Sequence, residues 1–534
     1  MKIHATTTTA FLLMASSSSC ARAFSSFLSK SVARGGSLSM STLAENPLLQ
    51  QEALPKFASI QPADLTPAVT ELLTKMEQEF MDLESILESN DSPDYDQVLP
   101  QVERIQFPIG YAWGVAGHLN GVKNGDELRA AYEQNQPKVV ESMTKFSQSK
   151  PLYNALETLV PKLDGSDFET SQKRRAVDGS LHSMKLGGVG LEGEQKERFN
   201  SMKMRLAELS TSFSNNVLDA TKAFSLTIDD PAKMEGVPAS AKAMWANAHV
   251  MSLRSLAKEG EEIPDMDPEK GPYRVTLDAP SYIAVLSHLP DRKLREEIYR
   301  ASITRASETS EKDNVPIVYE ILTLKNDMAK ILGFKNYAEQ SLSRKMAPSV
   351  DAVRELSDLI AEKALPAAIK ELAEITALAR QNGGDEYSEA NLEKLMPWDT
   401  TFWSERLKES KFDMTAEQLR PYFALPNVLE GMFGLVKRIF NIEVRSADGE
   451  AEVWNKDVRF FNVYDVDSEK HIASFFLDPY SRPEDKRGGA WMDVCIGKSE
   501  AVQREIPVAY LTCNGSPPVG DTPSLMTFGE VSIL

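Results

Sequence analysis

The 534-residue sequence predicts a mainly helical protein with a small β-sheet near its C-terminus. Two observations lead to this fold class. From Asn46 to about Val444, apolar residues recur every three or four positions, which is the spacing of one face of an α-helix. After Val444, short apolar and aromatic runs alternate with clusters of Asp, Ser, Gly and Pro, which is typical of strands joined by turns.

Three apolar stripes illustrate the helical pattern, and all three are expected to lie in the core. The first follows Thr66-Pro67, which predicts a helix start, and contains Val69, Leu72, Leu73, Met76, Phe80, Leu83 and Leu87. The second contains Phe199, Met202, Leu206, Leu209, Phe213 and Val217. The third contains Val353, Leu356, Ile360, Ile369, Leu372 and Ile375. Because it continues past Pro366, we expect one helix that kinks at the proline.

Four strands are predicted in the C-terminal part, at Val458 to Asp465, His471 to Tyr480, Gly489 to Ile496 and Pro507 to Asn514. Thr527 to Leu534 has the pattern of another helix start. The sequence therefore divides into a targeting segment, an N-terminal helical domain, a helical body and a strand-rich start of a further domain, at residues 1–45, 46–190, 191–445 and 446–534.

Composition excludes some classes of partner. The chain holds 78 acidic and 59 basic residues, a formal net charge of −19. Nucleic acids and anionic membranes require basic patches, so neither is expected as a partner. The three cysteines, Cys20, Cys495 and Cys513, are too few for a disulfide framework and favour a reducing compartment. Cys495 and Cys513 show no metal-binding spacing and are expected to be buried structural thiols.

The first 45 residues have the composition of a targeting sequence. Glu45 is their only acidic residue, against eleven serines and four basic residues. A short apolar run from Ala10 to Ala15, then Ala21-Arg22-Ala23-Phe24, then a Ser/Arg-rich stretch resembles the two-part presequences of complex plastids. We expect a plastid protein, with a mitochondrial presequence or a cytosolic form starting at Met40 as alternatives.

Motif searches assign no catalytic, cofactor-binding or metal-ligating residue. Residues 188–193 fit the dinucleotide fingerprint G-x-G-x-x-G, but a predicted helix precedes them, so we expect a turn between two helices. The six histidines, His4, His118, His182, His249, His288 and His471, include no His-Glu-x-x-His. His182 and His288 are expected to be structural histidines.

Several longer stretches resemble one family, the oligopeptidase A and thimet oligopeptidase group of zincin-type, M3-type peptidases. The resemblance runs in order from residue 46 to the end, and oligopeptidase A fits better than dipeptidyl carboxypeptidase. The stretches that carry it are Asn46 to Leu49, Leu54 to Phe57, Ser214 to Thr221, Ala279 to Tyr282, Leu332 to Ala338, Pro397 to Asp399, Gln418 to Phe423, Lys486 to Asp493 and Pro507 to Asn514.

This resemblance implies a mostly helical ellipsoid with a deep channel, a small sheet and a single zinc. It implies a zinc-dependent, monomeric endopeptidase that hydrolyses short peptides, including cleaved targeting peptides. In the family, two histidines one helical turn apart and a downstream glutamate hold the zinc, and the motif's own glutamate activates the metal-bound water.

The chain departs from the family at its end. Residues 516–520 resemble the Pro-rich turn and residues 525–531 the lead-in segment that precede the family's His-Glu-Phe-Gly-His helix, and the sequence stops at Leu534. The zinc ligands are therefore expected beyond Leu534, and the chain as written is expected to be inactive. The alternatives are a truncated form of an active peptidase, a non-catalytic helical paralogue that binds peptides or proteins, and a pseudogene product.

The C-terminal strands would lack their cover in such a chain. Val508, Tyr510, Leu511, Phe475, Phe476 and Trp491 are accordingly expected to be exposed. Burying one such side chain is worth roughly 1.5–3 kcal/mol. Residues 446–534 are therefore expected to be loose, with protease cutting first near residues 446–470.

Overall fold

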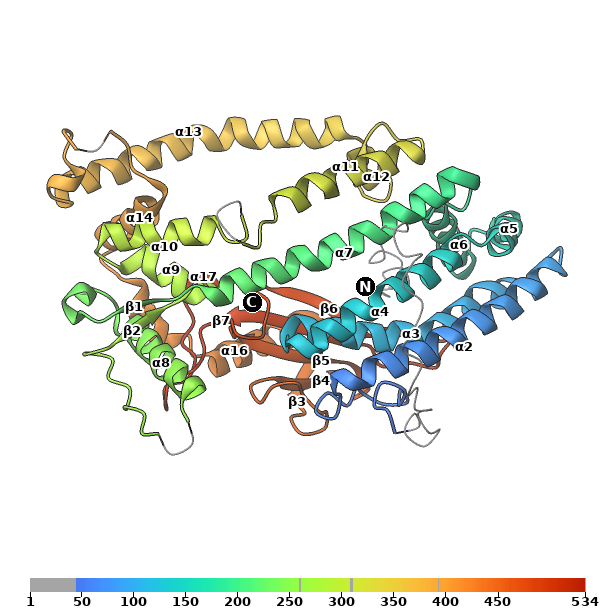
Figure 1. Cartoon of the computed structure of the whole chain (residues 1–534), viewed down its shortest axis with the longest axis horizontal. Helices are drawn as coiled ribbons and strands as arrows, with labels where there is room; N and C mark the ends of the chain where they lie inside the picture. Colours follow the sequence, from blue (N-terminus) through green and yellow to red (C-terminus); the bar gives the residue numbers. More distant parts are fainter. Residues whose placement is uncertain (1–44, 259–260, 308–310, 392, 534) are drawn as a thin grey trace, which may run out of the picture.

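The computed structural model describes residues 45–258, 261–307, 311–391 and 393–533 (Figure 1). It is mainly helical and has a small mixed sheet near the C-terminus, which confirms the predicted fold class. Within these ranges, none of the helices is long and apolar enough to cross a membrane. The expected presequence and His4 lie outside the described residues, and the domain boundaries stay a prediction.

The N-terminal part is a stack of long helices, of which α2 to α6 share the largest core cluster, while α7 packs with α11 in a cluster of its own. They are α2 (Pro62–Glu88), α3 (Tyr95–Val122), α4 (Asp126–Ser147), α5 (Lys150–Leu159), α6 (Phe168–Leu186) and α7 (Gly193–Ala223), with the 3₁₀ turn η1 (Pro161–Leu163). The predicted start at Thr66-Pro67 is wrong. Helix α2 begins at Pro62, because Asp64 Oδ2 accepts a hydrogen bond from the Gln61 backbone N–H at 2.8 Å and caps the helix there. The first apolar stripe is buried as predicted.

The middle of the chain forms a second helical group. Its helices are α8 (Ala239–Leu256), α9 (Ala279–His288), α10 (Arg292–Ile303), α11 (Val315–Ile331), α12 (Tyr337–Leu342), α13 (Val350–Asn382), α14 (Pro397–Phe412), α15 (Ala416–Leu419) and α16 (Leu425–Phe440), with η2 (Pro231–Met234), η3 (Asp385–Tyr387) and η4 (Arg420–Tyr422). A two-stranded sheet of β1 (Leu226–Ile228) and β2 (Tyr273–Val275), missed by the sequence analysis, packs against α8 around Trp245. The second stripe is buried from Phe199 to Leu209, but Phe213 is exposed.

The C-terminal sheet has five strands in the order β3-β4-β5-β7-β6. They are β3 (Ile442–Ser446), β4 (Arg459–Asp465), β5 (His471–Tyr480), β6 (Trp491–Ile496) and β7 (Val508–Gly515). The four predicted strands are confirmed, and β3 was missed. β5 and β7 run parallel, and the other neighbouring pairs are antiparallel. Helix α17 (Phe528–Ile533) follows, as predicted.

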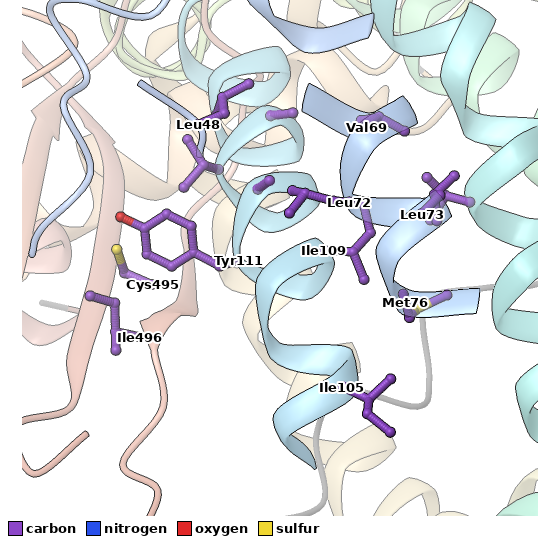
Figure 2. Packing of buried hydrophobic residues seen from close by; sticks show 14 of the residues in the cluster. Leu48, Val69, Leu72, Leu73, Met76, Ile105, Ile109, Tyr111, Cys495 and Ile496 are labelled. Carbon is purple, nitrogen blue, oxygen red and sulfur yellow. The ribbon is translucent and has the colours of Figure 1, made fainter. Parts of the chain in front are cut away.

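Both faces of this sheet contact helices, which corrects the expectation of exposed strands. On one face, Phe476 and Tyr510 are buried with Phe57 and Val115 in the main core. Figure 2 shows Tyr111 of α3 next to Cys495 and Ile496 of β6 in the same core. On the other face, Leu425 and Leu429 of α16 pack with the sheet. Of the six residues expected to be exposed, Val508, Tyr510 and Phe476 are buried and Leu511, Phe475 and Trp491 are half-buried. The helices that precede the sheet in sequence cover it.

Helix α13 contradicts the expected core position of the third stripe. It is one continuous helix through Pro366, but every residue from Val353 to Ala373 is exposed. Only its C-terminal end is anchored, by Ile375 and Ala379, which pack with Tyr387 and Trp403. In Figure 1, α13 runs along the top of the molecule. The apolar spacing identified the helix correctly but did not identify what it packs against.

Candidate functional site

The five-stranded sheet ends in an open edge at β6. This strand pairs with β7, with Trp491 opposite Thr512 and Val494 opposite Ala509. Within the described ranges, no strand pairs with its other side. Met492 is 75% exposed, and its neighbours Asp493 and Val494 are also exposed. Such an edge can pair with an extended peptide, although the Val494 N–H already donates to Asp493 Oδ1 at 2.8 Å, so a peptide would have to replace that bond. We therefore take the open edge of β6 as the candidate site.

A buried ion cluster fixes the segment that leads into β6. Asp478 of β5 accepts hydrogen bonds from Trp454 Nε1 at 2.9 Å, Arg482 Nη1 at 2.7 Å and Lys486 Nζ at 2.8 Å. Lys486 Nζ also donates to the backbone carbonyls of Asp478, Tyr480 and Cys513. The cluster thereby ties the β5–β6 connection to both β5 and β7.

The charges in this cluster shift one another's pKa. Burial by itself raises the pKa of Asp478, but the bonds from Arg482 and Lys486 outweigh burial and hold it below its usual value. Burial lowers the pKa of Lys486 to about 8, against the opposing effect of Asp478. The sequence analysis quoted Lys486 only as part of a motif. The feature of the sequence that could have revealed this cluster is Asp478, because an acidic residue inside an apolar strand requires a buried partner.

Two of the resembling motifs meet at the start of β6. Asn514 Nδ2 donates to the carbonyl oxygens of Arg487, at 3.0 Å, and Gly489. Gly489 has φ +94°, a conformation that favours glycine. The Arg487 backbone N–H donates to the carbonyl of Gly121 at 2.9 Å, which anchors the loop on α3. The stretches Lys486 to Asp493 and Pro507 to Asn514 therefore together fix the position and direction in which β6 begins.

The predicted turn and lead-in segment lie beside the end of β7. Leu525 pairs with Ala424, and the Met526 N–H donates to the Phe423 carbonyl at 2.9 Å. Thr527 and Glu530 cap α17 reciprocally, because the Thr527 N–H donates to Glu530 Oε2 and the Glu530 N–H to Thr527 Oγ1. This capping sets the direction in which α17 begins.

Other resembling stretches hold helices together and carry no site. In Ser214 to Thr221 on α7, Asn215 bonds to Glu133 of α4, and Asn216 bonds to Asn314 beside α11. In Pro397 to Asp399, the buried Asp399 accepts both a two-point contact from Arg292, at 2.9 and 2.8 Å, and a bond from Tyr387 at 2.9 Å. These polar groups are satisfied within the fold.

The histidines do not assemble a metal site. His118 is buried and stacks on Tyr510, with 3.6 Å between ring centroids. His182 Nε2 lies 3.1 Å from Ser343 Oγ, and His471 Nε2 lies 2.9 Å from Ser474 Oγ. Burial lowers the pKa of His288 to about 4. Among the residues that the structure describes, no three His, Cys, Asp or Glu side chains form a metal-holding group. These residues therefore do not fit the zinc that the resemblance implies.

The two described cysteines and the glycine-rich stretch behave largely as expected. Cys495 is buried, and burial raises its pKa to about 12, so it carries no thiolate. Cys513 is only half-buried, and burial raises its pKa as well. Residues 188–193 form the predicted turn between α6 and α7, where the Val189 N–H bonds to the Met184 carbonyl. The stretch fits the dinucleotide fingerprint in sequence only, because the helix α6, and not a strand, precedes it.

Two protein-family models match parts of this chain. Residues 285–534 match the model of peptidase family M3, and residues 69–196 match that of the neurolysin/thimet oligopeptidase N-terminal domain. The chain is 41% identical to the probable cytosolic oligopeptidase A of Arabidopsis thaliana over 495 residues, which cover 92% of this chain and 68% of that relative. The chain belongs to peptidase family M3.

Two further relatives within the M3 family agree with this assignment. The chain is 42% identical to the organellar oligopeptidase A, chloroplastic/mitochondrial, of Arabidopsis thaliana. It is 37% identical to oligopeptidase A of Escherichia coli. The alignments cover 92% of this chain but only 60% of the organellar relative and 68% of the bacterial one. A large part of each relative therefore has no counterpart among these 534 residues.

Proposed function

We propose that this chain is the scaffold of a zinc-dependent endopeptidase that hydrolyses short oligopeptides, and that its zinc ligands come from sequence outside these 534 residues. Membership of peptidase family M3 supports peptide hydrolysis. The single observation that carries the proposal for this chain is the open edge of β6, which suits an extended peptide. The lack of a His-Glu-x-x-His motif supports the external origin of the ligands.

The substrate would add to β6 as a further strand. Backbone pairing along an edge is indifferent to side-chain identity, so it suits peptides of varied sequence, while exposed side chains such as Met492 add apolar contact. The Asp478–Lys486 cluster holds the start of β6 in place, so the strand loses little conformational entropy when a peptide binds. Short, extended peptides are the proposed substrates, and the chain is proposed to act as a monomer.

The alternative is a helical paralogue that binds peptides or proteins without cleaving them. The same open edge of β6 supports it, since strand addition needs no metal. The two proposals differ in what happens when the missing part is supplied. We define the completing segment as the part of the Arabidopsis organellar oligopeptidase A that follows its counterpart of residue 533. The joined chain is residues 45–533 followed by this segment in one polypeptide.

The test is cleavage of a quenched fluorescent peptide of about ten residues by the joined chain. We expect cleavage, and we expect Met492→Lys to raise KM about fivefold, which is about 1 kcal/mol of lost docking. Met81→Lys, at an exposed methionine of α2, is the matched control and should leave KM unchanged. A joined chain that folds and binds zinc but cleaves nothing would favour the paralogue. An unchanged KM for Met492→Lys would exclude the β6 edge as the docking site.

We also propose that residues 1–45 direct the protein to a plastid, on the basis of their Ser-rich composition with a single acidic residue. The two Arabidopsis relatives are an organellar and a probable cytosolic oligopeptidase A. Mass spectrometry of the native N-terminus distinguishes the two cases. We expect a mature terminus near residue 45, whereas a terminus at Met1 or Met40 would contradict organellar import.

A further inference from the structure

The exposed part of α13 carries apolar side chains on two opposite sides. An α-helix turns about 100° per residue, so nine residues turn it through two and a half turns. Ile360 and Ile369 are nine residues apart and therefore point in opposite directions. Both are large and apolar, and they are 58% and 61% exposed. The helix thus has no single apolar face.

Each half of the helix has its own apolar stripe. Before Pro366, Val353, Leu356 and Ile360 follow the spacing i, i+3, i+7 of one face. From Leu365, directly before Pro366, the second stripe continues with Ile369 and Leu372 on the other side, at the spacing i, i+4, i+7. All six side chains are exposed. The apolar side of the helix therefore changes at the proline.

The charged side changes at the same place. In the first half, Asp358 and Glu362 lie about 160° away from Ile360 on the helix. In the second half, Glu371 lies about 160° from Ile369. Each half is amphipathic by itself, and the two amphipathic patterns are out of phase by half a turn. Leu359, which is 53% exposed, lies about 100° from Ile360 and broadens the apolar side of the first half.

A helix that is apolar on opposite sides belongs in an interior. A partner with one flat face, including a second copy packed along α13, would cover one half and leave the other in water. The occupant must reach both sides. The relatives contain a large stretch with no counterpart among these 534 residues, and the family match continues to residue 534. That stretch is a polypeptide long enough to surround a helix.

We propose that α13 is an internal helix of the complete peptidase, with the completing segment packed on one side of its first half and on the opposite side of its second half. The stripe of Val353, Leu356 and Ile360 is one contact, and the stripe of Leu365, Ile369 and Leu372 is the other. The assignment rests on the family membership and needs neither zinc nor a bound peptide. Its failure and a failure of peptide cleavage are therefore separate results.

Single cysteines introduced on α13 test each side independently. Ile360→Cys and Ile369→Cys report the two stripes, and Asp358→Cys and Glu371→Cys are matched controls on the charged sides. The rate of labelling by a maleimide is measured for residues 45–534 alone and for the joined chain, with labelling of the native Cys495 and Cys513 subtracted by using the parent chain. Because all four positions are exposed in the chain alone, the substitutions should not disturb its fold.

We expect all four cysteines to react fast in the chain alone. In the joined chain, labelling at 360 and 369 should slow at least about tenfold, while 358 and 371 should change less than about twofold. Fast labelling of either apolar position in the joined chain would overturn the two-sided contact. Protection that rises with concentration in the chain alone would assign the face to a second copy and would overturn the proposal as well.

Discussion

At the scale of single residues, His118 shows how the fold decides a chemical role that the sequence leaves open. Its ring lies against Tyr510 and Trp454 in the core that joins the helices to the sheet, and its Nε2 has no hydrogen-bond partner. Burial lowers the pKa of His118 to about 3. A histidine in this environment stays neutral and acts as an aromatic side chain.

His118 should make the folded chain sensitive to acid. Its pKa is about 3 in the folded state and about 6.5 in the unfolded state, so the unfolded state binds the extra proton between these values. Stability is therefore fully present above pH 6.5 and falls as the pH drops through this window, by about 2 kcal/mol at pH 5. His118→Phe should remove most of this loss.

The measurement is the urea midpoint of residues 45–534 at pH 7.5 and pH 5. His182→Phe is the control, because that imidazole lies beside Ser343 near the surface and partial burial lowers its pKa without enclosing it. An equal loss of stability in His118→Phe and the parent chain would show that His118 does not carry the acid sensitivity.

The hydrogen-bond partners of individual side chains were the part of the site that could not be predicted from the sequence. Lys486 and Asn514 stand in motifs that resemble the family, but their roles depend on the carbonyl groups of Tyr480 and Arg487. Such carbonyl groups are common to all residues and carry no sequence signal. The lack of paired histidines was, by contrast, readable directly from the sequence.

At the scale of elements, the spacing of apolar residues predicted which helices and strands exist. It predicted less well where each one begins and what it packs against. The strands from β4 to β7 appear within a residue or two of their predicted bounds. Helix α2 starts earlier than predicted because Pro62 and the Gln61–Asp64 cap precede the more conspicuous Thr66-Pro67. β3 was missed because only Asn441 separates it from α16, so that its apolar residues Ile442 and Val444 read as a continuation of the helical pattern.

Helix α13 marks the limit of periodicity as a guide. Apolar spacing shows that a helix has a side to bury, but it does not name the partner. In α13 the spacing itself contained more information than a single stripe, since the change of side at Pro366 can be counted from the sequence. We infer a two-sided contact only because the structure shows that both sides are exposed.

At the scale of the whole molecule, the sheet and the N-terminal helices share one core. Phe57 contacts Trp454, Phe476 and Tyr510, with ring centroids 5.0 to 6.2 Å apart, although 397 to 453 residues separate them in sequence. Residues 446–534 were expected to be loose because several of their apolar side chains were expected to be exposed. Several of these side chains are buried. Long-range contacts of this kind have no local signature, so the sequence could not have revealed them.

The shared core also explains how a scaffold can be well packed although its described residues form no group of three metal ligands. The alignments with relatives in family M3 cover the helices and the sheet described here. The zinc ligands, by contrast, are proposed to come from sequence outside these 534 residues. The arrangement of β6, β7 and α17 depends on contacts within the described residues, such as the bond between the Met526 N–H and the Phe423 carbonyl. It should therefore persist when the completing segment is added.

The zinc content of the joined chain tests this central claim most directly. Residues 45–534 and the joined chain are purified in the presence of zinc, passed through a desalting column and measured by mass spectrometry for bound metal. We predict less than about 0.1 zinc per molecule for residues 45–534 and about one for the joined chain, since structural requirements for zinc include three or four converging ligands. One tightly bound zinc in residues 45–534 alone would contradict the account.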